Sequence, residues 1–223
     1  EVGGGAQTLC LGASLHILGT GLIGLAREGA LKVREVVLNH AEGYDAAEFK
    51  HGPNTILGKN TLFSIQDLAG LLEVYEQHRD GRPFAGGIES LQAWPELVET
   101  RFSNYPLLFV CPAEERDVRI TISQIHTHKI RGADILLVAE KNPELALAVA
   151  GKPMGQDRYW SKYLEVPPCG DANLFVFAAS VVLQRLAFRM SVLKMEYLDR
   201  LAVADHGVHP DAPKNVSKSI TVD

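Results

Sequence analysis

Several features are absent from this 223-residue sequence, and their absence excludes classes of function before any motif is considered. It contains no cluster of lysines and arginines and carries a formal net charge of −5, so it lacks the basic surface of a nucleic-acid-binding protein. Its three cysteines, Cys10, Cys111 and Cys169, are far apart and form no CxxC motif, which indicates neither a disulfide framework nor a zinc site. We therefore expect a protein of the reducing cytoplasm.

Long hydrophobic runs are also missing. The longest apolar run, from Leu174 to Leu183, is too short to cross a bilayer, which takes about 20 residues, so we expect a buried helix there and no membrane partner. No basic, apolar segment of the signal-peptide type opens the chain. With 46% hydrophobic and 22% charged residues, the composition is typical of a globular protein with a substantial core.

What the sequence does contain is an alternation of short apolar runs with helical patterns. Runs of Leu, Val and Ile predict strands at 15–18, 107–111, 135–139 and 163–167. Helical patterns occupy 22–39, 115–131, 143–150 and 172–201. Continuous apolar strands alternating with helices are typical of a parallel sheet covered on both faces, so we predict an α/β fold with three layers, helix, sheet and helix.

Four segments fall outside this alternation. Residues 1–13 show neither the helical nor the strand periodicity, so we interpret them as a lead-in or linker before a main domain at 14–202. The segment from His40 to Pro53 reads as irregular, and Gly52 and Pro53 place His51 on a loop. Residues 58–104 read as a helical insertion. The last segment, 203–223, is either a disordered tail or, as its apolar Ile220 and Val222 favour, a tail that docks on the domain.

The helix predicted at 22–39 has two distinct faces. Successive residues turn by about 100°, so Glu28, Lys32 and Glu35 share one stripe. The opposite face is apolar and consists of Leu22, Ala26, Ala30, Val33 and Val37. The stripe is either a solvated ladder of ion pairs or a catalytic group in which a carboxylate beside a lysine, close to the C-terminal end of a strand, shuttles a proton.

A second motif overlaps the start of this helix. Gly19-Thr20-Gly21-Leu22-Ile23-Gly24 matches GxGxxG between a strand and a helix, where a nicotinamide dinucleotide would place its pyrophosphate. That interpretation also requires an acidic residue about twenty positions later, for which Glu42 or Asp45 is available, and a strand leading to it.

A resemblance covers both ends of the chain. The segment EGALKVREVVLNHAEGYDAAEFKHGP at 28–53 and the tail DAPKNVSKSITVD at 211–223 resemble the second sugar-isomerase (SIS) domain of the glutamine–fructose-6-phosphate aminotransferase family. The resemblance covers the chain except the lead-in and the 58–104 insertion. It implies about five parallel strands, and an enzyme that has two such domains and works as a homodimer.

The resemblance also implies a role for each matching residue, on a hexose phosphate substrate and without a cofactor or metal. Glu35 matches the base that moves a proton between C1 and C2 of the open-chain sugar. His51 matches a residue that helps open the sugar ring and comes across the dimer interface. Lys218 matches a tail residue that closes over the site, and Glu28 and Lys32 match supporting positions.

The chain departs from the family in two ways. It contains no SxSGxT loop, with which the family binds the sugar phosphate, and no glutaminase domain with an N-terminal cysteine. It is therefore a fragment, one half of an enzyme whose other SIS domain lies upstream or on another chain, or a module that binds phosphosugars without converting them. Synthase, deaminase and plain isomerase share the matching residues.

The remaining polar residues have simpler interpretations. His126 and His128 are two apart on a predicted helix and should face different directions. His206 and His209 have the spacing HxxH without a third metal ligand nearby, and Asp134 and Lys141 flank a strand as expected surface residues.

Overall fold

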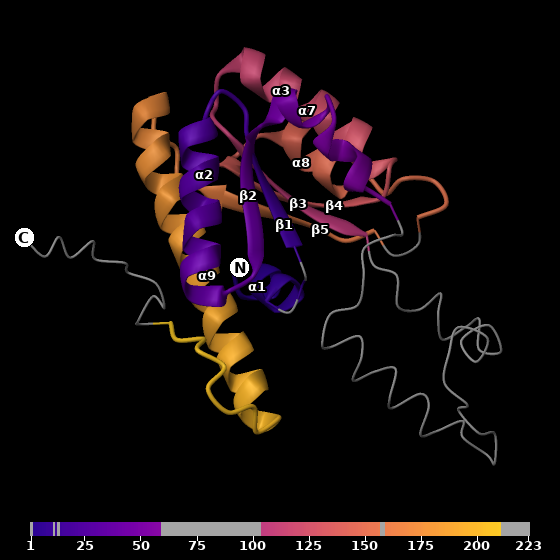
Figure 1. Cartoon of the computed structure of the whole chain (residues 1–223). Helices are drawn as coiled ribbons and strands as arrows, with labels where there is room; N and C mark the ends of the chain where they lie inside the picture. The colour runs from indigo at the N-terminus through magenta and orange to yellow at the C-terminus, as the bar shows by residue number, and fades with distance from the viewer. Residues whose placement is uncertain (1, 11, 13, 59–103, 157–158, 211–223) are drawn as a thin grey trace, which may run out of the picture.

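A five-stranded parallel sheet forms the centre of the computed structural model, which describes residues 2–10, 12, 14–58, 104–156 and 159–210 (Figure 1). The strands have the order β2-β1-β3-β4-β5. Their bounds are β1 Ser14–Gly19, β2 His40–Asp45, β3 Tyr105–Cys111, β4 Ala133–Glu140 and β5 Ser161–Val166. The predicted three-layer α/β fold and its five parallel strands are confirmed.

Helices cover both faces of this sheet (Figure 1). One face carries α1 Val2–Leu9, α2 Ile23–Lys32 and α9 Ala172–Arg200. The other carries α3 Ala46–Phe49, α7 Glu115–Lys129 and α8 Pro143–Ala150. Because successive strand residues point to opposite faces, the central strands need apolar residues at every position, and β3 and β4 are buried almost throughout.

Local sequence signals explain where the predicted helices begin and end. Asn142 caps α8 by accepting bonds from the backbone N–H groups of residues 144 and 145, and Pro143 follows in the first turn. Asp171 caps α9 in the same way. Gly132 has a φ of 94°, a left-handed conformation that favours glycine, directly after α7. These helices lie within two residues of their predicted bounds.

The segment after the first helix was predicted wrongly. Residues 40–45, HAEGYD, form the edge strand β2, and α3 and the short 3-10 helix η2 Pro53–Ile56 follow. Only Ala41 of this strand is fully buried. An edge strand pairs on one side and faces solvent, so its sequence carries no apolar run to reveal it. His51 does lie in the turn between α3 and η2, as expected.

The lead-in was also predicted wrongly. Residues 2–9 form α1, which packs against α9 although three glycines stand in its first turn. Ala6, Leu9 and Cys10 are buried in the core beside the sheet. Their burial outweighs the low helix propensity of glycine, which costs about 1 kcal/mol per residue relative to alanine.

Asp134 and Lys141, at the two ends of β4, differ in their exposure to solvent. Asp134 was expected at the surface but is buried and accepts hydrogen bonds from the Asn104 side chain at 3.0 Å and the Trp160 backbone N–H at 2.8 Å. Burial raises the pKa of Asp134 to about 6. Lys141 is exposed, as predicted. The insertion at 59–103 and the tail at 211–223 lie outside the described residues.

His128 and its neighbour on α7 face different directions, as predicted, with His126 exposed and His128 fully buried. The His128 ring lies between the rings of Phe49 and Phe109, at centroid distances of 5.2 and 6.2 Å. Neither of its ring nitrogens has a hydrogen-bond partner within the described ranges. Burial lowers the pKa of His128 to about 4, so the folded protein holds this ring neutral.

Because His128 is buried as a neutral ring, we predict that the folded protein loses stability in mild acid. Between pH 6.5 and about 4 the unfolded chain protonates His128 and the folded chain does not, so the free energy of unfolding falls as the pH falls. His128→Leu should flatten this dependence by up to about 1.4 kcal/mol per pH unit. Urea unfolding at a series of pH values measures it, and the exposed His126→Leu is the matched control.

Other titratable groups also change how the free energy of unfolding depends on pH. They do so equally in the original protein and in His128→Leu, so they do not change the difference between the two. Burial also lowers the pKa of His16 to about 4, which adds to the loss, whereas protonation of Asp134 in the folded state below about pH 6 opposes it. An unchanged slope in His128→Leu, with the two proteins equally folded at pH 7, would mean that His128 is protonated in the native state.

Candidate functional site

The predicted stripe of charges exists on α2 and its continuation. Lys32 Nζ lies 2.8 Å from Glu35 Oε2 and 3.5 Å from Glu28 Oε1. The three side chains are partly exposed, with 30%, 27% and 41% of their respective surfaces accessible. The hydrogen bond with Glu35 raises the pKa of Lys32, so the lysine remains a cation between two carboxylate side chains. The predicted apolar face is confirmed, since Ala26, Ala30, Val33 and Val37 are buried and Leu22 packs against the core.

Glu35 does not stand on a regular α-helix. The π-helix η1, Val33–Val37, continues α2 and carries Glu35 at its middle position. Such widened turns are rare and occur frequently at functional sites, because they change the direction in which one residue projects. Nothing in the local sequence marks this turn, and the prediction of a single helix over 22–39 missed it.

Contacts from distant parts of the chain hold this π-helix and its exit. Leu38, the residue after η1, has a left-handed backbone with a φ of 59°, which is uncommon for leucine. Lys194 on α9 donates to the Val37 carbonyl at 2.9 Å and to the Asn39 side-chain oxygen at 2.6 Å. The Asn39 amide in turn donates to the carbonyls of Leu9 and Cys10. The end of the π-helix is therefore bonded to α9, and Asn39 just after it is bonded to both α9 and the end of α1.

The other predicted residues are not brought to this stripe. The prediction of a position close to the C-terminal end of a strand was wrong for Glu35, because α2 runs antiparallel to β1 and η1 lies just before β2 begins. His51 follows α3, which begins where β2 ends, so Glu35 and His51 belong to opposite ends of one sheet (Figure 1). Lys218 lies outside the described residues.

Two cavities adjoin other parts of the fold. The larger, about 510 Å³, lies on the opposite flank of α2 over the edge strand and is lined by charged residues that include Arg27, Arg34, Asp45 and Glu48. The smaller, about 270 Å³, lies beyond the ends of β3 and β4 beside Glu114, Glu140 and Asp171. Neither of these two cavities includes Glu28, Lys32 or Glu35, so the stripe lies outside both.

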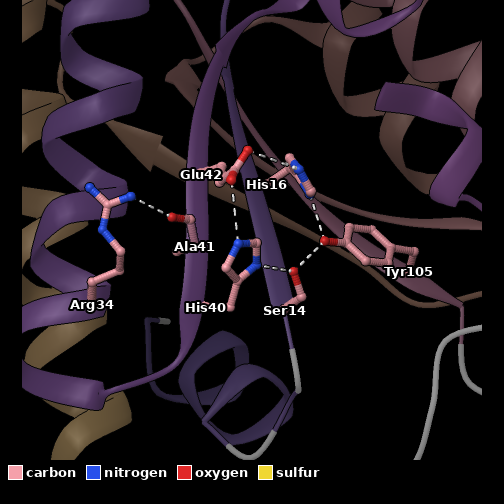
Figure 2. Close-up of polar contacts among 7 residues, drawn as sticks. All are labelled: Ser14, His16, Arg34, His40, Ala41, Glu42 and Tyr105. Carbon is pink, nitrogen blue, oxygen red and sulfur yellow. Dashed lines mark hydrogen bonds and ion pairs between the residues drawn. The ribbon is translucent and has the colours of Figure 1, made fainter. Parts of the chain in front are cut away.

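A polar cluster that the sequence interpretation missed lies on the other face of the same sheet edge (Figure 2). The Ser14 hydroxyl shares hydrogen bonds with His40 Nδ1 at 2.8 Å and the Tyr105 hydroxyl at 2.6 Å. The Tyr105 hydroxyl also lies 2.6 Å from His16 Nδ1, and Glu42 lies 3.4 Å from His40 Nε2. The parallel register pairs Ser14 with His40 and His16 with Glu42, which a correct assignment of β2 would have revealed.

Burial determines the electrostatics of this cluster. It lowers the pKa of His16 to about 4 and raises the pKa of Tyr105 to about 12, so both side chains are neutral near pH 7. Buried polar groups that bond to one another in this way stabilise a unique packing. We interpret the cluster as structural, joining β1, β2 and β3.

The glycine-rich turn has a packing explanation. A side chain at Gly19 would meet the Leu22 carbonyl oxygen at 2.4 Å, and Gly21 has a left-handed φ of 67°. Near Gly21 lies a carboxylate oxygen of Asp117, which would repel a pyrophosphate. The side chain of Asp45 caps α3 by accepting a bond from the Ala47 N–H at 2.8 Å. These observations speak against a dinucleotide site.

The remaining candidates for metal ligands do not gather. His206 Nε2 lies 3.1 Å from an Asp199 oxygen, and its ring centroid is 6.1 Å from that of His209. Within the residues that the structure describes, no three His, Cys, Asp or Glu side chains are grouped to hold a metal ion. None of the three cysteines forms a disulfide.

Comparison with known proteins agrees with this fold. The chain is 28% identical over 221 residues to glutamine–fructose-6-phosphate aminotransferase (isomerizing) of Aeropyrum pernix, an alignment that covers 98% of this chain and 25% of that protein. Among solved structures, the C-terminal domain of glucosamine-fructose-6-phosphate aminotransferase from Francisella tularensis superposes with a TM-score of 0.52 at 20% identity, over 87% of this chain and 39% of that one. The chain has the fold of a sugar-isomerase (SIS) domain.

Two further relatives have the same name, but they match this chain over very different lengths. The Arabidopsis thaliana protein of the same name is 26% identical over 97% of this chain and 22% of its own length. The Helicobacter pylori protein is 56% identical over a stretch of 41 residues. No family model matches the chain. The chain spans about a quarter of the length of the curated relatives it matches.

Proposed function

We propose that this SIS domain is the isomerase half of a phosphosugar aminotransferase or isomerase, acting on fructose 6-phosphate or glucosamine 6-phosphate. The observation that carries the proposal is the Glu28–Lys32–Glu35 stripe, with Glu35 on a π-helix whose last residue, Val37, accepts a hydrogen bond from Lys194 of α9. The similarity to aminotransferases named as isomerizing, over 98% of the chain, supports it.

The chemistry assigns a role to each charged group. Glu35 removes the proton from C1 of an open-chain ketose, so that the C–H electron pair forms the C1–C2 double bond and the carbonyl pair moves onto the C2 oxygen as an enediolate. The C1 hydroxyl proton then passes to the C2 oxygen, and Glu35 returns its proton to C2 as the C1 carbonyl of the aldose forms. Lys32, a cation 2.8 Å from Glu35, stabilises the developing charge on an enediol oxygen. Glu28 holds the lysine from the opposite side.

The two remaining residues would reach the site from elsewhere. In this proposal His51 assists ring opening in the site of a neighbouring subunit, in keeping with its place at the other end of the sheet from Glu35. Lys218 on the tail approaches the C2 oxygen. The phosphate is bound by a further SIS domain, since this chain has no SxSGxT loop and spans only a quarter of its relatives.

Isotope exchange tests the proposal directly. The complete protein is incubated with fructose 6-phosphate in deuterium oxide, and NMR follows the proton on C1. We expect deuterium at C1 with fructose 6-phosphate and none with unphosphorylated fructose. Absence of exchange with both fructose 6-phosphate and glucosamine 6-phosphate would overturn the proposal.

A second candidate is a phosphosugar-binding module without turnover. The missing phosphate loop and the position of the stripe outside both cavities favour it. It predicts that glucosamine 6-phosphate raises the melting temperature in a saturable way while C1 exchanges no proton. Deuterium exchange by this chain alone would exclude it.

A further inference from the structure

The larger of the two cavities, about 510 Å³, is lined by α2 and η1 on one side and by β2 and α3 on the other. Two small residues, Ala30 on α2 and Gly43 on β2, form part of its lining. A side chain at Gly43 would meet the backbone of α2, so the strand lies directly against the helix there. Sites for small molecules have volumes of roughly 300–1,000 Å³. The cavity therefore has room for a ligand of the size of a sugar phosphate.

The charges around this cavity are separated by sign. Among its lining residues, the positive side chains, Arg27 and Arg34, come from α2 and η1. The negative side chains, Glu42, Asp45 and Glu48, come from β2 and α3. Within the described ranges, no ion pair joins the two sides. Opposite charges that face one cavity without pairing to each other suit a ligand that carries both signs, because one wall would repel a ligand of a single sign.

The two arginines form a wall that suits an anion. Arg34 Nη1 donates to the Ala41 carbonyl at 2.9 Å, which holds the guanidinium against the strand while its other N–H groups can still donate. Arg27 is exposed and, among the residues that the structure describes, has no hydrogen-bond or ion-pair partner. Guanidinium groups bind phosphate and carboxylate oxygens through paired N–H donors. We therefore expect the anionic group of a ligand on this wall.

The opposite wall holds one carboxylate in a fixed position. Asp45, the last residue of β2, accepts a hydrogen bond from the Ala47 backbone N–H at 2.8 Å. An ionised carboxylate has about four acceptor sites, so this group can accept further bonds from an ammonium group. Glu42 lies instead beside two histidines, 3.4 Å from His40 and 3.9 Å from His16. Asp45 is therefore the carboxylate best placed to receive a positive group in the cavity.

We propose that this cavity binds a small zwitterion of the amino sugar phosphate class, with its phosphate on Arg27 and Arg34 and its ammonium group on Asp45. Arg34 lies against Ala41 and Arg27 lies against Gly43, so the phosphate sits beside the middle of β2. Asp45 is two to four residues further along the strand, or about 7–13 Å. An amino sugar phosphate separates its two charges by several bonds, whereas an α-amino acid carries both on one carbon and is too short.

This site is separate from the proposed catalytic stripe, because none of Glu28, Lys32 and Glu35 lines the cavity. The inference shares a class of ligand with the proposed function and does not rest on catalysis by Glu35. Isothermal titration calorimetry of the 223-residue chain with glucosamine 6-phosphate tests it. We expect saturable binding of one molecule per chain. Glucosamine lacks the phosphate and glucose 6-phosphate lacks the ammonium group, so each should bind at least about tenfold more weakly.

Two substitutions test the position and orientation of the ligand. Arg27→Gln should weaken the binding of glucosamine 6-phosphate about 10- to 100-fold and leave that of glucosamine unchanged, because Arg27 contacts the phosphate. Asp45→Asn should weaken it similarly and leave that of glucose 6-phosphate unchanged. Asparagine caps a helix about as well as aspartate, so α3 should remain intact. Arg185→Gln, at an exposed position on α9, is the matched control and should bind all three ligands like the original protein. Circular dichroism checks the fold of each variant.

Binding and exchange measurements separate this inference from the proposed function. Absence of saturable binding, or unchanged affinity for glucosamine 6-phosphate in folded Arg27→Gln and Asp45→Asn, would overturn the cavity site. Binding that is lost in Lys32→Gln and retained in those two variants would place the ligand on the stripe instead. Exchange at C1 in the complete protein without binding in the cavity would count against this inference alone. Binding in the cavity without exchange would count against the isomerase alone.

Discussion

Glu35→Gln in the complete protein should lower the rate of proton exchange between C1 and C2 of the sugar by about 10²- to 10⁴-fold, the range for loss of a general base. Glutamine has the shape of glutamate and retains an oxygen that accepts the hydrogen bond from Lys32, now 2.8 Å away. It cannot take up a proton from carbon. The fold and the binding of the sugar should therefore change little, and deuterium incorporation at C1 measures the effect.

Two matched variants separate the base from its surroundings. Glu28→Gln removes the carboxylate on the other side of Lys32, at 3.5 Å, and should reduce exchange much less than Glu35→Gln. Glu48→Gln alters the carboxylate on α3 beside the larger cavity and should leave exchange unchanged. Full exchange by Glu35→Gln would refute the assignment, and an equal loss in Glu28→Gln would show that the ion-pair group as a whole, and not one base, is required.

Elements whose signal is local could be predicted from the sequence. The strands β3 and β4 are buried on both faces, so each reads as an unbroken run of apolar residues. The core face of α2 follows from a period of 3.6 residues, which depends only on the sequence of that helix. Caps such as Asn142 and Asp171 act on N–H groups two or three residues away, so they too are visible in the chain.

Elements that depend on distant contacts could not be predicted. The edge strand β2 has mostly polar residues and becomes a strand through its pairing with β1. The helix α1 begins with glycines and is stabilised by packing on α9. The last residue of the π-helix, Val37, is bonded by Lys194, which is 157 residues away along the chain. No window of sequence around Glu35 contains that lysine.

The candidate site likewise has one part that could be predicted from the sequence and one part that could not. The relative positions of Glu28, Lys32 and Glu35 follow from helix geometry and were predicted from their spacing. The distance between Glu35 and His51 depends on which way β2 runs after the π-helix, and β2 was not recognised. Within one chain, Glu35 precedes β2 and His51 follows the helix after it, so the two residues belong to opposite ends of that strand.

Gly43→Ala should lower the free energy of unfolding by about 3 kcal/mol, at the upper end of the cost of overpacking. Gly43 is the point where β2 passes closest to α2. A Cβ atom there would lie 2.4 Å from the Arg27 backbone nitrogen and 2.6 Å from the Ala26 carbonyl oxygen. Backbone atoms in the middle of a helix cannot move aside singly, so α2 must shift away from the sheet. For a chain of this size we expect the melting temperature to fall by about 6–12 °C.

Two glycines of α2 provide the controls. A Cβ at Gly29 would meet the Leu183 Cδ1 atom at 2.8 Å, the end of a flexible side chain, so Gly29→Ala should cost less than Gly43→Ala. At Gly24 no atom lies within 4 Å, and alanine should stabilise the helix by about 0.5–1 kcal/mol. Differential scanning calorimetry of the three variants should rank their melting temperatures with Gly24→Ala highest and Gly43→Ala lowest. If Gly43→Ala melts at the temperature of the original protein, β2 and α2 are not in close contact at Gly43.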